Sequence, residues 1–526
     1  MGFCGQIEKV LFDNVGSWIR FVFPDASFNN VFVRPGLCVW HLGNCVRIYL
    51  ILGAIFCIPT SGWSQSNSEN RLSTVEKLAP VGWQNACQIW DWAEPGYQET
   101  KSAALLSNWL QESGFQVQRG VAGIPTAFTA TIGTGHPVMA VLGEYDALPG
   151  LAQRAVPYQQ GIDSQSYGHA CGHHLFGVAS AMAAIALGKE VQAGRLSGTV
   201  RYYGCPAEEG GSAKVFMVRD GLFSDVDFAL HWHPSASNSA GDRSTLARIA
   251  VKFRFHGVSA HAAGAPDQAR SALDAVELTN FGVQLLREHI PQDSRIHYVI
   301  TSGGEAPNVV PDFAEVYYYV RHPNAKVVRE LYQRVLKCAQ AGALATETRL
   351  ETVNEGGIME LVPNNALSSI VIEKLRSLND LRYGPDESEF ALKLQETLQN
   401  PNDLSIIQLV VDRSGEVSKG STDVGDVSWV VPTAGFTTSC WVPGTPGHSW
   451  QAVACGRTEI ARRGMILAAK VLTESGAAIM QSPAVIQSAK QELQRRLNEQ
   501  KYDPLISPDQ QPPLNYRRPA KGTASD

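Results

Sequence analysis

Hydrophobic and polar positions follow two different periods along this chain, and together they predict an α/β protein. From Leu72 to Ala104, apolar residues recur every three or four positions, which is the spacing of a helix. Apolar runs in His136–Gly150 and Val226–Pro234 predict buried strands, and Gly198–Met217 is expected to form a strand, a turn and a helix. A small-residue helix is expected at Leu175–Val191. Because strands alternate with helices, we expect a mixed sheet with helices on both faces.

The pattern changes near Arg248, where a second kind of domain is predicted. Arg248–Ala263 alternates like an amphipathic strand, and a helix is expected over Ser271–His289. Two further strands follow, and then a helix over Ala325–Ala345. The order strand, helix, strand, strand, helix, strand predicts a ferredoxin-like α+β domain inserted into the first one.

These changes divide the chain into five segments. We expect a leader over 1–64, a catalytic domain in two parts, an inserted domain, and a C-terminal helix with an extended tail. The boundaries are 65–247 and 365–482 for the two catalytic parts, 248–364 for the inserted domain, and 483–526 for the tail.

The N-terminal region carries a second signal. Ile48–Ile58 is an apolar run of about 11 residues, too short to span a bilayer but typical of a signal-peptide core. Small and polar residues follow, so cleavage is predicted near Ser64 or Gln65, giving a periplasmic or secreted protein with no stable membrane insertion after processing. The residues before Val46 suggest a misplaced start. The alternative is a cytoplasmic protein with a short buried helix or a leader.

Composition narrows the class of protein without deciding its function. The chain has 526 residues, 44% of them hydrophobic, and a formal net charge of -6. No basic stripe is present, so we expect no nucleic-acid partner. The ten cysteines form no CxxC pair, which favours neither a disulfide framework nor a zinc ribbon.

Chemically active side chains gather where predicted strands end. In open α/β sheets the binding crevice lies beyond the carboxyl ends of the strands, so these side chains should converge. One thiolate, three imidazoles and a carboxylate would suit a pair of divalent cations sharing one bridging ligand. The side chains at these ends are Asp146, Cys171, His173, Glu208, Glu209, His233 and His448.

Two adjacent glutamates at one strand end suggest a division of labour. Successive side chains in a strand point in opposite directions, so one carboxylate can bind metal while the other faces water. The second carboxylate would be the general base, and the cations would make the water easier to deprotonate.

Eight motifs in order resemble a known family. The chain is similar to the binuclear metallo-amidohydrolases that include aminoacylases, carboxypeptidase G and plant auxin-conjugate hydrolases, and most of all to the branch formed by the B-type subunits of p-aminobenzoyl-glutamate hydrolase. The resemblance implies a zinc-peptidase-like catalytic domain with an inserted dimerisation (lid) domain. It rests on WAEPGYQETKSA, GEYDALPG, HACGHH, CPAEEGG, GVSAHAAGAPDQARSALDAV, GGEAPNVVPDFAEVYYYVR, STDVGDVSW and GTPGHSW.

The resemblance assigns the metal ligands residue by residue. Cys171 and His173 match a metal-binding Cys-x-His motif whose thiolate can bridge two ions. Glu209, His233 and His448 match the remaining ligands. The cofactor implied is a pair of divalent ions in each protomer. A thiolate ligand favours Zn²⁺, while nitrogen and oxygen ligands also suit Mn²⁺.

The resemblance also implies roles outside the ligand set. Glu208 matches the general base, and Asp146 matches an acid that orients a metal ligand from behind. His261 matches a histidine that reaches the neighbouring protomer's site and stabilises the oxyanion. Asn308 and Arg321 match residues that hold the substrate, and Arg321 suits a carboxylate through paired hydrogen bonds.

Two histidines leave alternatives open. His174 stands where relatives usually have Asn or Asp, so it either adds a ligand or, as we favour, replaces a hydrogen bond. His231 lies two positions before His233 on the same strand face and is a rival ligand. The resemblance favours His233.

The resemblance implies a hydrolase of N-acyl amino acids, first of all p-aminobenzoyl-glutamate, a folate breakdown product. Other N-acyl amino acids and unusual dipeptides are alternatives, and so are a Cys171 nucleophile with His173 as its base and a non-catalytic scaffold of the same fold. A homodimer is expected, and a related A-type chain is a further possible partner.

Overall fold

A computed structural model describes residues 61–517 and three short strands before them. The chain divides into two units, Met1–Thr60 and Ser61–Asp526. In the first unit, β1 (Ile7–Val10), β2 (Trp18–Phe21) and β3 (Phe32–Val33) form an antiparallel sheet. The predicted signal-peptide core at Ile48–Ile58 lies outside the described residues, and export stays a prediction.

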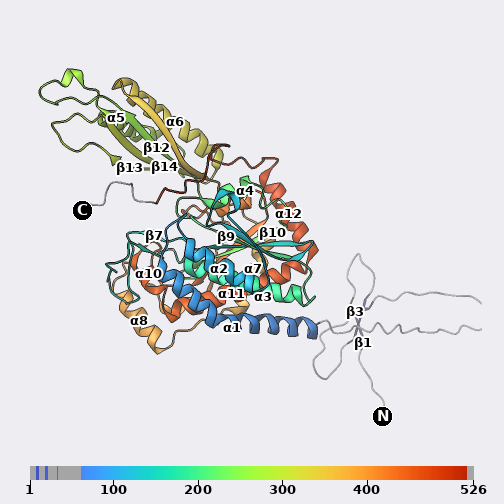
Figure 1. Ribbon diagram of the computed structural model, residues 1–526. Coiled ribbons are helices and arrows are strands. Elements are labelled where there is room, and N and C mark those ends of the chain that lie inside the picture. Colours follow the sequence, from blue (N-terminus) through green and yellow to red (C-terminus); the bar gives the residue numbers. More distant parts are fainter. Residues whose placement is uncertain (1–6, 11–17, 22–31, 34–60, 518–526) are drawn as a thin grey trace, which may run out of the picture. The chain divides into compact units, whose positions relative to one another are not determined.

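The second unit is built around a mixed sheet of eight strands (Figure 1). Its centre is parallel, because β6 pairs with both β9 and β10, and β10 pairs with β17. β5 and β4 add antiparallel strands at one side. The strands run in the order β16 (Val410–Asp412), β11 (Asn238–Ala240), β17 (Thr433–Ser439), β10 (Phe228–Ser235), β6 (Val138–Glu144), β9 (Gly198–Cys205), β5 (Phe128–Thr134) and β4 (Gln116–Arg119).

Both faces of this sheet are covered, which explains its continuous apolar strands. Along β6, Met139 and Val141 pack into the core cluster on one face, whereas Val138, Ala140 and Leu142 pack into the cluster on the other. Strand alternation therefore divides one buried strand between two cores.

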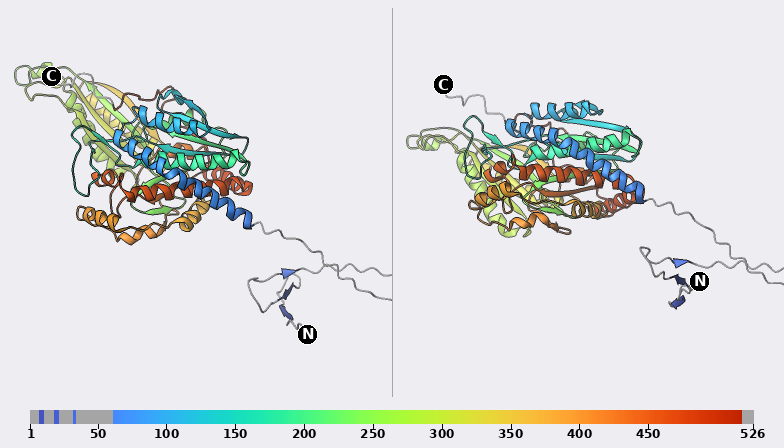
Figure 2. Two further views of the ribbon diagram at one scale, coloured as in Figure 1. Left: turned by 60° about the horizontal axis from the view of Figure 1, so that its bottom comes forward. Right: turned by 90° about the horizontal axis from the view of Figure 1, so that it is seen from below.

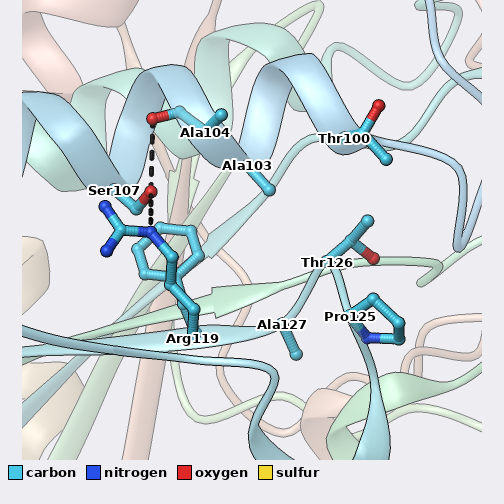
Figure 3. A pocket seen from close by; sticks show the side chains of 9 residues that line it. Thr100, Ala103, Ala104, Ser107, Arg119, Pro125, Thr126 and Ala127 are labelled. Carbon is cyan, nitrogen blue, oxygen red and sulfur yellow. Dashed lines mark hydrogen bonds between the residues drawn. The ribbon is translucent and has the colours of Figure 1, made fainter.

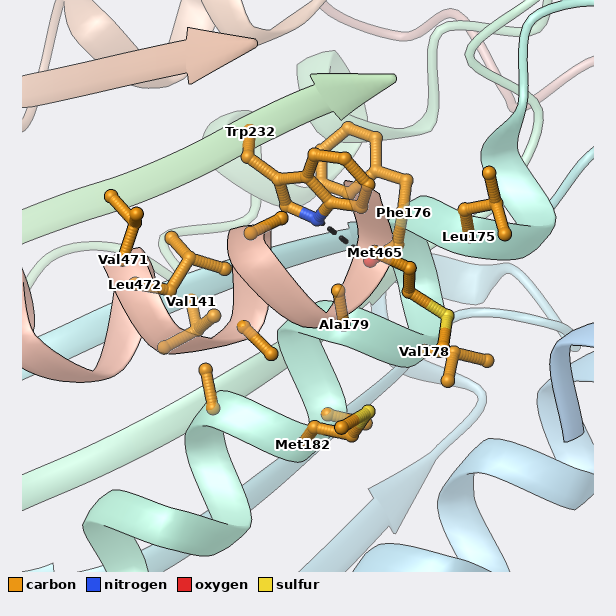
Figure 4. Packing of buried hydrophobic residues seen from close by; sticks show 14 of the residues in the cluster. Val141, Leu175, Phe176, Val178, Ala179, Met182, Trp232, Met465, Val471 and Leu472 are labelled. Carbon is orange, nitrogen blue, oxygen red and sulfur yellow. Dashed lines mark hydrogen bonds between the residues drawn. The ribbon is translucent and has the colours of Figure 1, made fainter. Parts of the chain in front are cut away.

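Helix α3 (His173–Gln192) lies in the larger of these cores. It is long and apolar enough to cross a membrane, but 89% of its apolar window is buried. Trp232 of β10 packs over it and donates its indole N–H to the carbonyl of Phe176 (Figure 4). Core packing accounts for the composition of this helix.

The other helices of the catalytic part lie around the sheet (Figure 2). α1 and α11 pack against α3, and α4 packs against α9. The bounds are α1 (Ser61–Trp92), α2 (Thr100–Glu112), α4 (Ala213–Arg219), α7 (Asn365–Leu378), α8 (Pro385–Gln395), α9 (Val424–Ser428), α10 (Trp450–Cys455), α11 (Glu459–Met480) and α12 (Pro483–Leu497), with a two-stranded sheet of β7 (Leu148–Pro149) and β8 (Tyr167–Gly168).

The helical pattern predicted over Leu72–Ala104 is divided between two helices. α1 ends at Trp92, and α2 begins at Thr100 after a turn in which Ala93 and Tyr97 have positive φ. The Glu94 carboxylate accepts the backbone N–H groups at the start of α2, so it caps the new helix.

The inserted domain has the predicted order of elements. It comprises β12 (Ala247–His256), α5 (Ala272–Leu286), β13 (Arg295–Ser302), β14 (Phe313–His322), α6 (Ala325–Ala345) and β15 (Arg349–Ile358). The four strands form an antiparallel sheet in the order β13-β14-β12-β15. Together with the mixed sheet, this confirms the predicted fold class.

The C-terminal segment after α12 returns along both domains. Leu505 belongs to the core of the inserted domain, and Ile506 belongs to a core of the catalytic part. Arg329 of α6 donates to the carbonyls of Asp503 and Pro504 (2.6 and 3.0 Å). The described part of the predicted extended tail is therefore packed against the rest of the molecule.

Candidate metal centre

The turn that precedes α3 presents Cys171 and His173 on the same side. Gly172 between them is the N-cap of α3 and has φ 77°, a left-handed conformation that glycine adopts most readily. A Cβ at this position would come within 2.8 Å of Pro234, which belongs to the neighbouring strand β10. The turn therefore needs glycine both for its backbone conformation and for its close approach to β10.

A second turn after β9 carries Glu208 and Glu209. Ala207 and Ser212, at its two ends, also have positive φ (54° and 56°), a strained conformation for residues with a side chain. Two buried acids hold this turn. Glu99 accepts the N–H of Ala207 at 2.8 Å, and Asp146 accepts the N–H of Glu209 at 2.9 Å.

The two turns meet and form two donor groups that share one sulfur. Cys171, His173 and His233 make the first group, and Cys171, Glu209 and His448 make the second. Within each group the donor atoms lie within 4.8 Å of one another. This arrangement could hold two cations with the thiolate between them, because each group supplies the soft or borderline donors that zinc prefers.

Two buried atoms of these groups have no hydrogen bond, as expected for atoms that bind a cation. Nδ1 of His173 is 2.8 Å from an oxygen of Asp146, which fixes the ring, while its buried Nε2 makes no hydrogen bond, although an oxygen of Glu144 lies 3.1 Å away. An oxygen of Glu209 is also buried without a hydrogen bond, although Nε2 of His448 lies 3.0 Å away. Buried donors of this kind are costly unless something binds them.

Glu208 lies beside the first group but in a different environment. It forms a third cluster with Glu144 and His173, again with donor atoms within 4.8 Å. Burial, followed by repulsion from Glu144 and Glu209, raises the pKa of Glu208 well above its usual value. A carboxyl group with a raised pKa can both accept and return a proton, which a general base needs.

The structure separates the two rival histidines of β10. His233 is 3.3 Å from Sγ of Cys171, whereas His231 belongs to no donor group among the described residues. His231 lies against Gly435 of β17, where a Cβ would overlap the imidazole ring. His174 is fully buried and donates from Nε2 to the carbonyl of Gly456 at 2.8 Å, outside the described donor groups.

The three predicted residues of the inserted domain lie apart from the donor groups. His261 is exposed, and its Nδ1 accepts the N–H groups of Ala263 and Gly264. Asn308 is exposed in a neighbouring loop, where its carbonyl accepts the N–H of Ala262. Arg321 lies on β14, half-buried, with its guanidinium over the ring of Tyr319 at 5.3 Å.

A buried ion cluster next to the centre was missed by the sequence interpretation. Lys214 of α4 is fully buried, and its Nζ lies 2.7 Å from Glu144 and 2.6 Å from Asp423. The other oxygen of Glu144 is 3.1 Å from Nε2 of His173. The available signals were Lys214 shortly after the CPAEEGG motif and Asp423 inside STDVGDVSW.

Arg517 of the C-terminal segment was also missed. Its Nη2 donates to the carbonyl of Glu209 at 2.7 Å, so both backbone groups of Glu209 are held by side chains. Its own carbonyl accepts the hydroxyl of Tyr167 (3.3 Å), from the strand that precedes Cys171. The tail composition, rich in Gln and Pro, gave no indication of this contact.

A cavity of about 140 Å³ between α2 and β5 is separate from this centre (Figure 3). Arg119 lines it and donates from Nε to the hydroxyl of Ser107, which donates to the carbonyl of Ala104. These polar groups satisfy one another, and none of the predicted site residues lines the cavity.

Comparison with known proteins addresses the family to which this chain belongs. A model of the peptidase dimerisation domain matches residues 245–347. The chain is 28% identical to the Xaa-Arg dipeptidase of Mus musculus over 78% of its length and 88% of that protein.

Solved structures share the fold at low identity. The aminobenzoyl-glutamate utilization protein of Klebsiella pneumoniae has a TM-score of 0.53 at 19% identity, covering 75% of this chain and 97% of that one. The YXEP protein of Bacillus subtilis, described as a dinuclear metal-binding peptidase of the M20 family, has a TM-score of 0.52 at 16% identity, covering 77% and 99%.

One relative decides the family. The chain is 41% identical to the B-type subunit of p-aminobenzoyl-glutamate hydrolase from Escherichia coli K12, over 79% of its own length and 92% of that protein. With this match and a dimerisation domain of the same kind, the chain belongs to the M20 family of peptidases and amidohydrolases, in the branch of the B-type p-aminobenzoyl-glutamate hydrolase subunits.

Proposed function

We propose that this chain is a metal-dependent amidohydrolase that releases amino acids from their N-acyl derivatives. The observation that carries the proposal is the sulfur of Cys171, shared by two donor groups, with the carboxyl group of Glu208 beside them. Membership of an amidohydrolase family supports the same chemistry.

The proposed ligands are Cys171, His173, Glu209, His233 and His448. When bound, two divalent cations would supply positive charge that polarises the amide carbonyl and makes water easier to deprotonate. Zn²⁺ and Mn²⁺ are the candidates, and the thiolate favours Zn²⁺.

Glu208 would move the proton. Its carboxylate accepts a proton from the attacking water, the new carbon–oxygen bond forms, and the carbon–nitrogen bond breaks. Glu208 then returns the same proton to the departing nitrogen, so the products are a carboxylic acid and a free amine. The Asp146 carboxylate would hold the His173 ring in place throughout, since it binds the nitrogen that faces away from the donor group.

We propose p-aminobenzoyl-glutamate and similar N-acyl glutamates as the first substrates to test. The name of the relative at 41% identity supports this choice. Arg321 would bind the α-carboxylate, because its planar guanidinium offers two parallel donors to a carboxylate. Other N-acyl amino acids and dipeptides are the alternative within the same chemistry, as the name of the Xaa-Arg dipeptidase relative indicates.

A homodimer through the inserted domain is the proposed assembly. Helix α5 exposes Leu278, Phe281 and Leu285 at helical spacing, with 44%, 64% and 57% of their surfaces accessible. In such a dimer, His261 would serve the neighbouring protomer's site. An A-type chain is a second possible partner, because the A-type subunit of p-aminobenzoyl-glutamate hydrolase from Escherichia coli K12 is also a relative, 28% identical over 48% of this chain. Light scattering of the purified chain would measure the assembly state.

The decisive experiment combines metal analysis with one substitution. Purified protein should contain about two equivalents of Zn²⁺ or Mn²⁺, and a chelator should abolish hydrolysis of p-aminobenzoyl-glutamate. Glu208→Gln should keep the metal but lose turnover by several orders of magnitude, because the base and the proton donor disappear together. Glu389→Gln, at an exposed glutamate of α8 paired only with Lys393, is the matched control.

Two results would contradict the proposal: a purified protein that hydrolyses the substrate without metal, or a Glu208→Gln variant with wild-type turnover. The first would favour Cys171 as a nucleophile. That alternative is weaker in this structure, because burial and then the charge of Glu209 raise the pKa of the Cys171 thiol, and a thiol is a poor nucleophile.

A further inference from the structure

Two arginines face each other on the inserted sheet. Arg248 of β12 and Arg321 of β14 are direct partners in the antiparallel register, so their side chains project from the same face of the sheet. The opposite face is covered by α5 and α6, whose core includes Val316, Tyr318 and Val320 of β14. The two guanidinium groups therefore lie on the face that these helices leave open.

Both arginines contact one aromatic ring. The guanidinium of Arg248 lies 4.7 Å from the ring centre of Tyr319, and that of Arg321 lies 5.3 Å from it. These ring contacts hold the side chains in place without using the N–H groups in the guanidinium planes.

Neither arginine has a carboxylate partner among the described residues within the 4.0 Å limit of an ion pair. Nε of each is buried without a hydrogen bond, and Arg248 is only 7% exposed. The one hydrogen bond to a side chain runs from Nη2 of Arg248 to the hydroxyl of Ser212, at 3.5 Å. A buried and a half-buried like charge side by side without a counter-ion lower the stability of a folded protein.

The other cations of β12 on the same face are neutralised. Arg254 of β12 forms ion pairs with Glu315 and Glu351, and Lys252 pairs with Glu355. On β12 the sheet therefore supplies a carboxylate to each of these cations except Arg248. Arg295 of β13, which pairs with Arg321 in the register, has no carboxylate partner among the described residues either, but it is exposed and donates to the carbonyls of Gln292 and Ser294. A missing counter-ion at one defined place indicates a ligand that brings its own negative charge.

Arg248 lies beside the turn that carries two of the candidate site residues, and Arg321 is its neighbour across the sheet. Ser212, which contacts Arg248, ends the turn that carries Glu208 and Glu209. Gly356 of the adjoining strand β15 approaches the same turn, since a Cβ there would lie 4.0 Å from the carbonyl of Gly210. A substrate held at the metal centre would thus have its amino-acid end within reach of this face.

We propose that Arg248 and Arg321 together bind a dicarboxylic amino acid, with Arg321 on the α-carboxylate and Arg248 on the carboxylate of the side chain. This inference rests on the proposed function and names the residue that would decide its substrate class. Arg248 is then a specificity-determining residue that selects acidic amino acids. A cationic side chain, such as the arginine of an Xaa-Arg dipeptide, would be repelled.

Two substrates of nearly the same shape test the proposal on the wild-type enzyme. p-Aminobenzoyl-glutamine replaces only the side-chain carboxylate of p-aminobenzoyl-glutamate with an amide. We expect kcat/KM for the glutamate substrate to be about 10- to 100-fold higher, the usual effect of one charge-assisted hydrogen-bonded contact. Equal values for the two substrates would overturn the inference while leaving the amidohydrolase proposal intact.

Substitutions then identify the residue responsible. Arg248→Met should bring the two kcat/KM values within about threefold of each other, by lowering only that of the glutamate substrate. Arg254→Met, on the same strand face, should keep the wild-type preference. Arg321→Met should lower both values together. A preference that survives Arg248→Met but is lost in Arg321→Met would refute the assignment.

Binding gives a readout that needs neither turnover nor a well-folded methionine variant. Glutarate should inhibit the wild-type enzyme or raise its melting temperature at concentrations about tenfold lower than glutaramate, its monoamide. Arg248→Lys keeps the charge but loses the paired donors, so this difference should shrink without vanishing. If glutarate and glutaramate act equally on the wild-type protein, the second carboxylate site does not exist.

Discussion

The cationic side chains on the two sides of the candidate centre differ in whether they have carboxylate partners. On the catalytic side, Lys214 has two carboxylates within 2.7 Å, and its backbone N–H also donates to Asp423. On the side of the inserted domain, Arg248 and Arg321 are adjacent, and neither has a carboxylate partner among the described residues. Burial, followed by repulsion from Arg248, lowers the pKa of Arg321.

Buried charges with carboxylate partners stabilise the fold, whereas the charges without partners are available to bind a negatively charged ligand. A buried ion cluster with all its partners fixes the geometry of the elements that it joins, here β6, α4 and the loop before α9. A buried charge without partners contributes no such support and lowers stability instead. The two regions should therefore respond to substitution with opposite signs.

Removal of Lys214 should have the largest effect on stability. Lys214→Met leaves Glu144 and Asp423 as uncompensated buried charges, and we expect a loss of about 3–5 kcal/mol in the free energy of unfolding. Lys393→Met, which breaks an exposed ion pair on α8, should leave the free energy of unfolding close to that of the wild type. Chemical denaturation measures both, and equal losses would contradict the comparison.

Asp426 provides the same contrast within one motif. It is fully buried, three residues after Asp423, and from the described residues its carboxylate receives the hydroxyl of Tyr502 and the N–H of Met359 but no cation. Burial raises its pKa to about 7. Because the folded protein holds this proton more tightly than the unfolded chain, stability should fall as the pH rises from about 4 to about 7.

Asp426→Asn should remove this dependence on pH. The variant should be more stable than the wild type at pH 8, by up to about 4 kcal/mol, and the gain should shrink toward pH 4. Urea denaturation at both pH values measures it. A gain that is larger at pH 4 would show that the sign is wrong.

Substitution of Arg517 would show whether metal binding depends on the hydrogen bond between Arg517 and the Glu209 carbonyl. Arg517→Met removes the bond to the Glu209 carbonyl and should weaken metal retention by about 10- to 100-fold, as loss of a residue that supports a ligand commonly does. Arg495→Met, at an exposed arginine near the end of α12, is the control. Competition with a chelator measures the effect, and identical retention in both variants would exclude a role for Arg517.

The smallest change in stability is expected at the arginine pair. Arg248→Met removes an uncompensated charge and keeps much of the side-chain volume, so the free energy of unfolding should stay within about 1 kcal/mol of wild type or rise. Thermal denaturation measures this. A loss comparable with that of Lys214→Met would mean that Arg248 supports the fold.

Much of this architecture follows from local patterns. The ferredoxin-like order was predicted because each strand and helix of the inserted domain has its own periodicity. The convergence of Cys171, His173, Glu209, His233 and His448 follows from the rule that binding groups gather at the carboxyl ends of parallel strands. The break at Ala93–Glu99 was missed because the helical spacing of apolar residues continues across it. Pro95 and Gly96, which lie in this turn, were the available signal.

The remaining features depend on tertiary contacts that no local pattern records. Lys214 looks like an ordinary helical lysine until folding places Glu144 and Asp423 beside it. Arg248 looks like a polar position in an alternating strand, and only the register with β14 reveals a like-charged neighbour. Whether a charge finds a partner is a property of the folded molecule, so it cannot be read from sequence.

The hydrogen bond between Arg517 and Glu209 joins residues 308 positions apart. During synthesis on the ribosome, the glutamate turn and its histidine and cysteine neighbours emerge long before the arginine that supports them. The support that Arg517 gives to Glu209 would therefore be completed only after the segment carrying Arg517 has been synthesised and has packed against the glutamate turn.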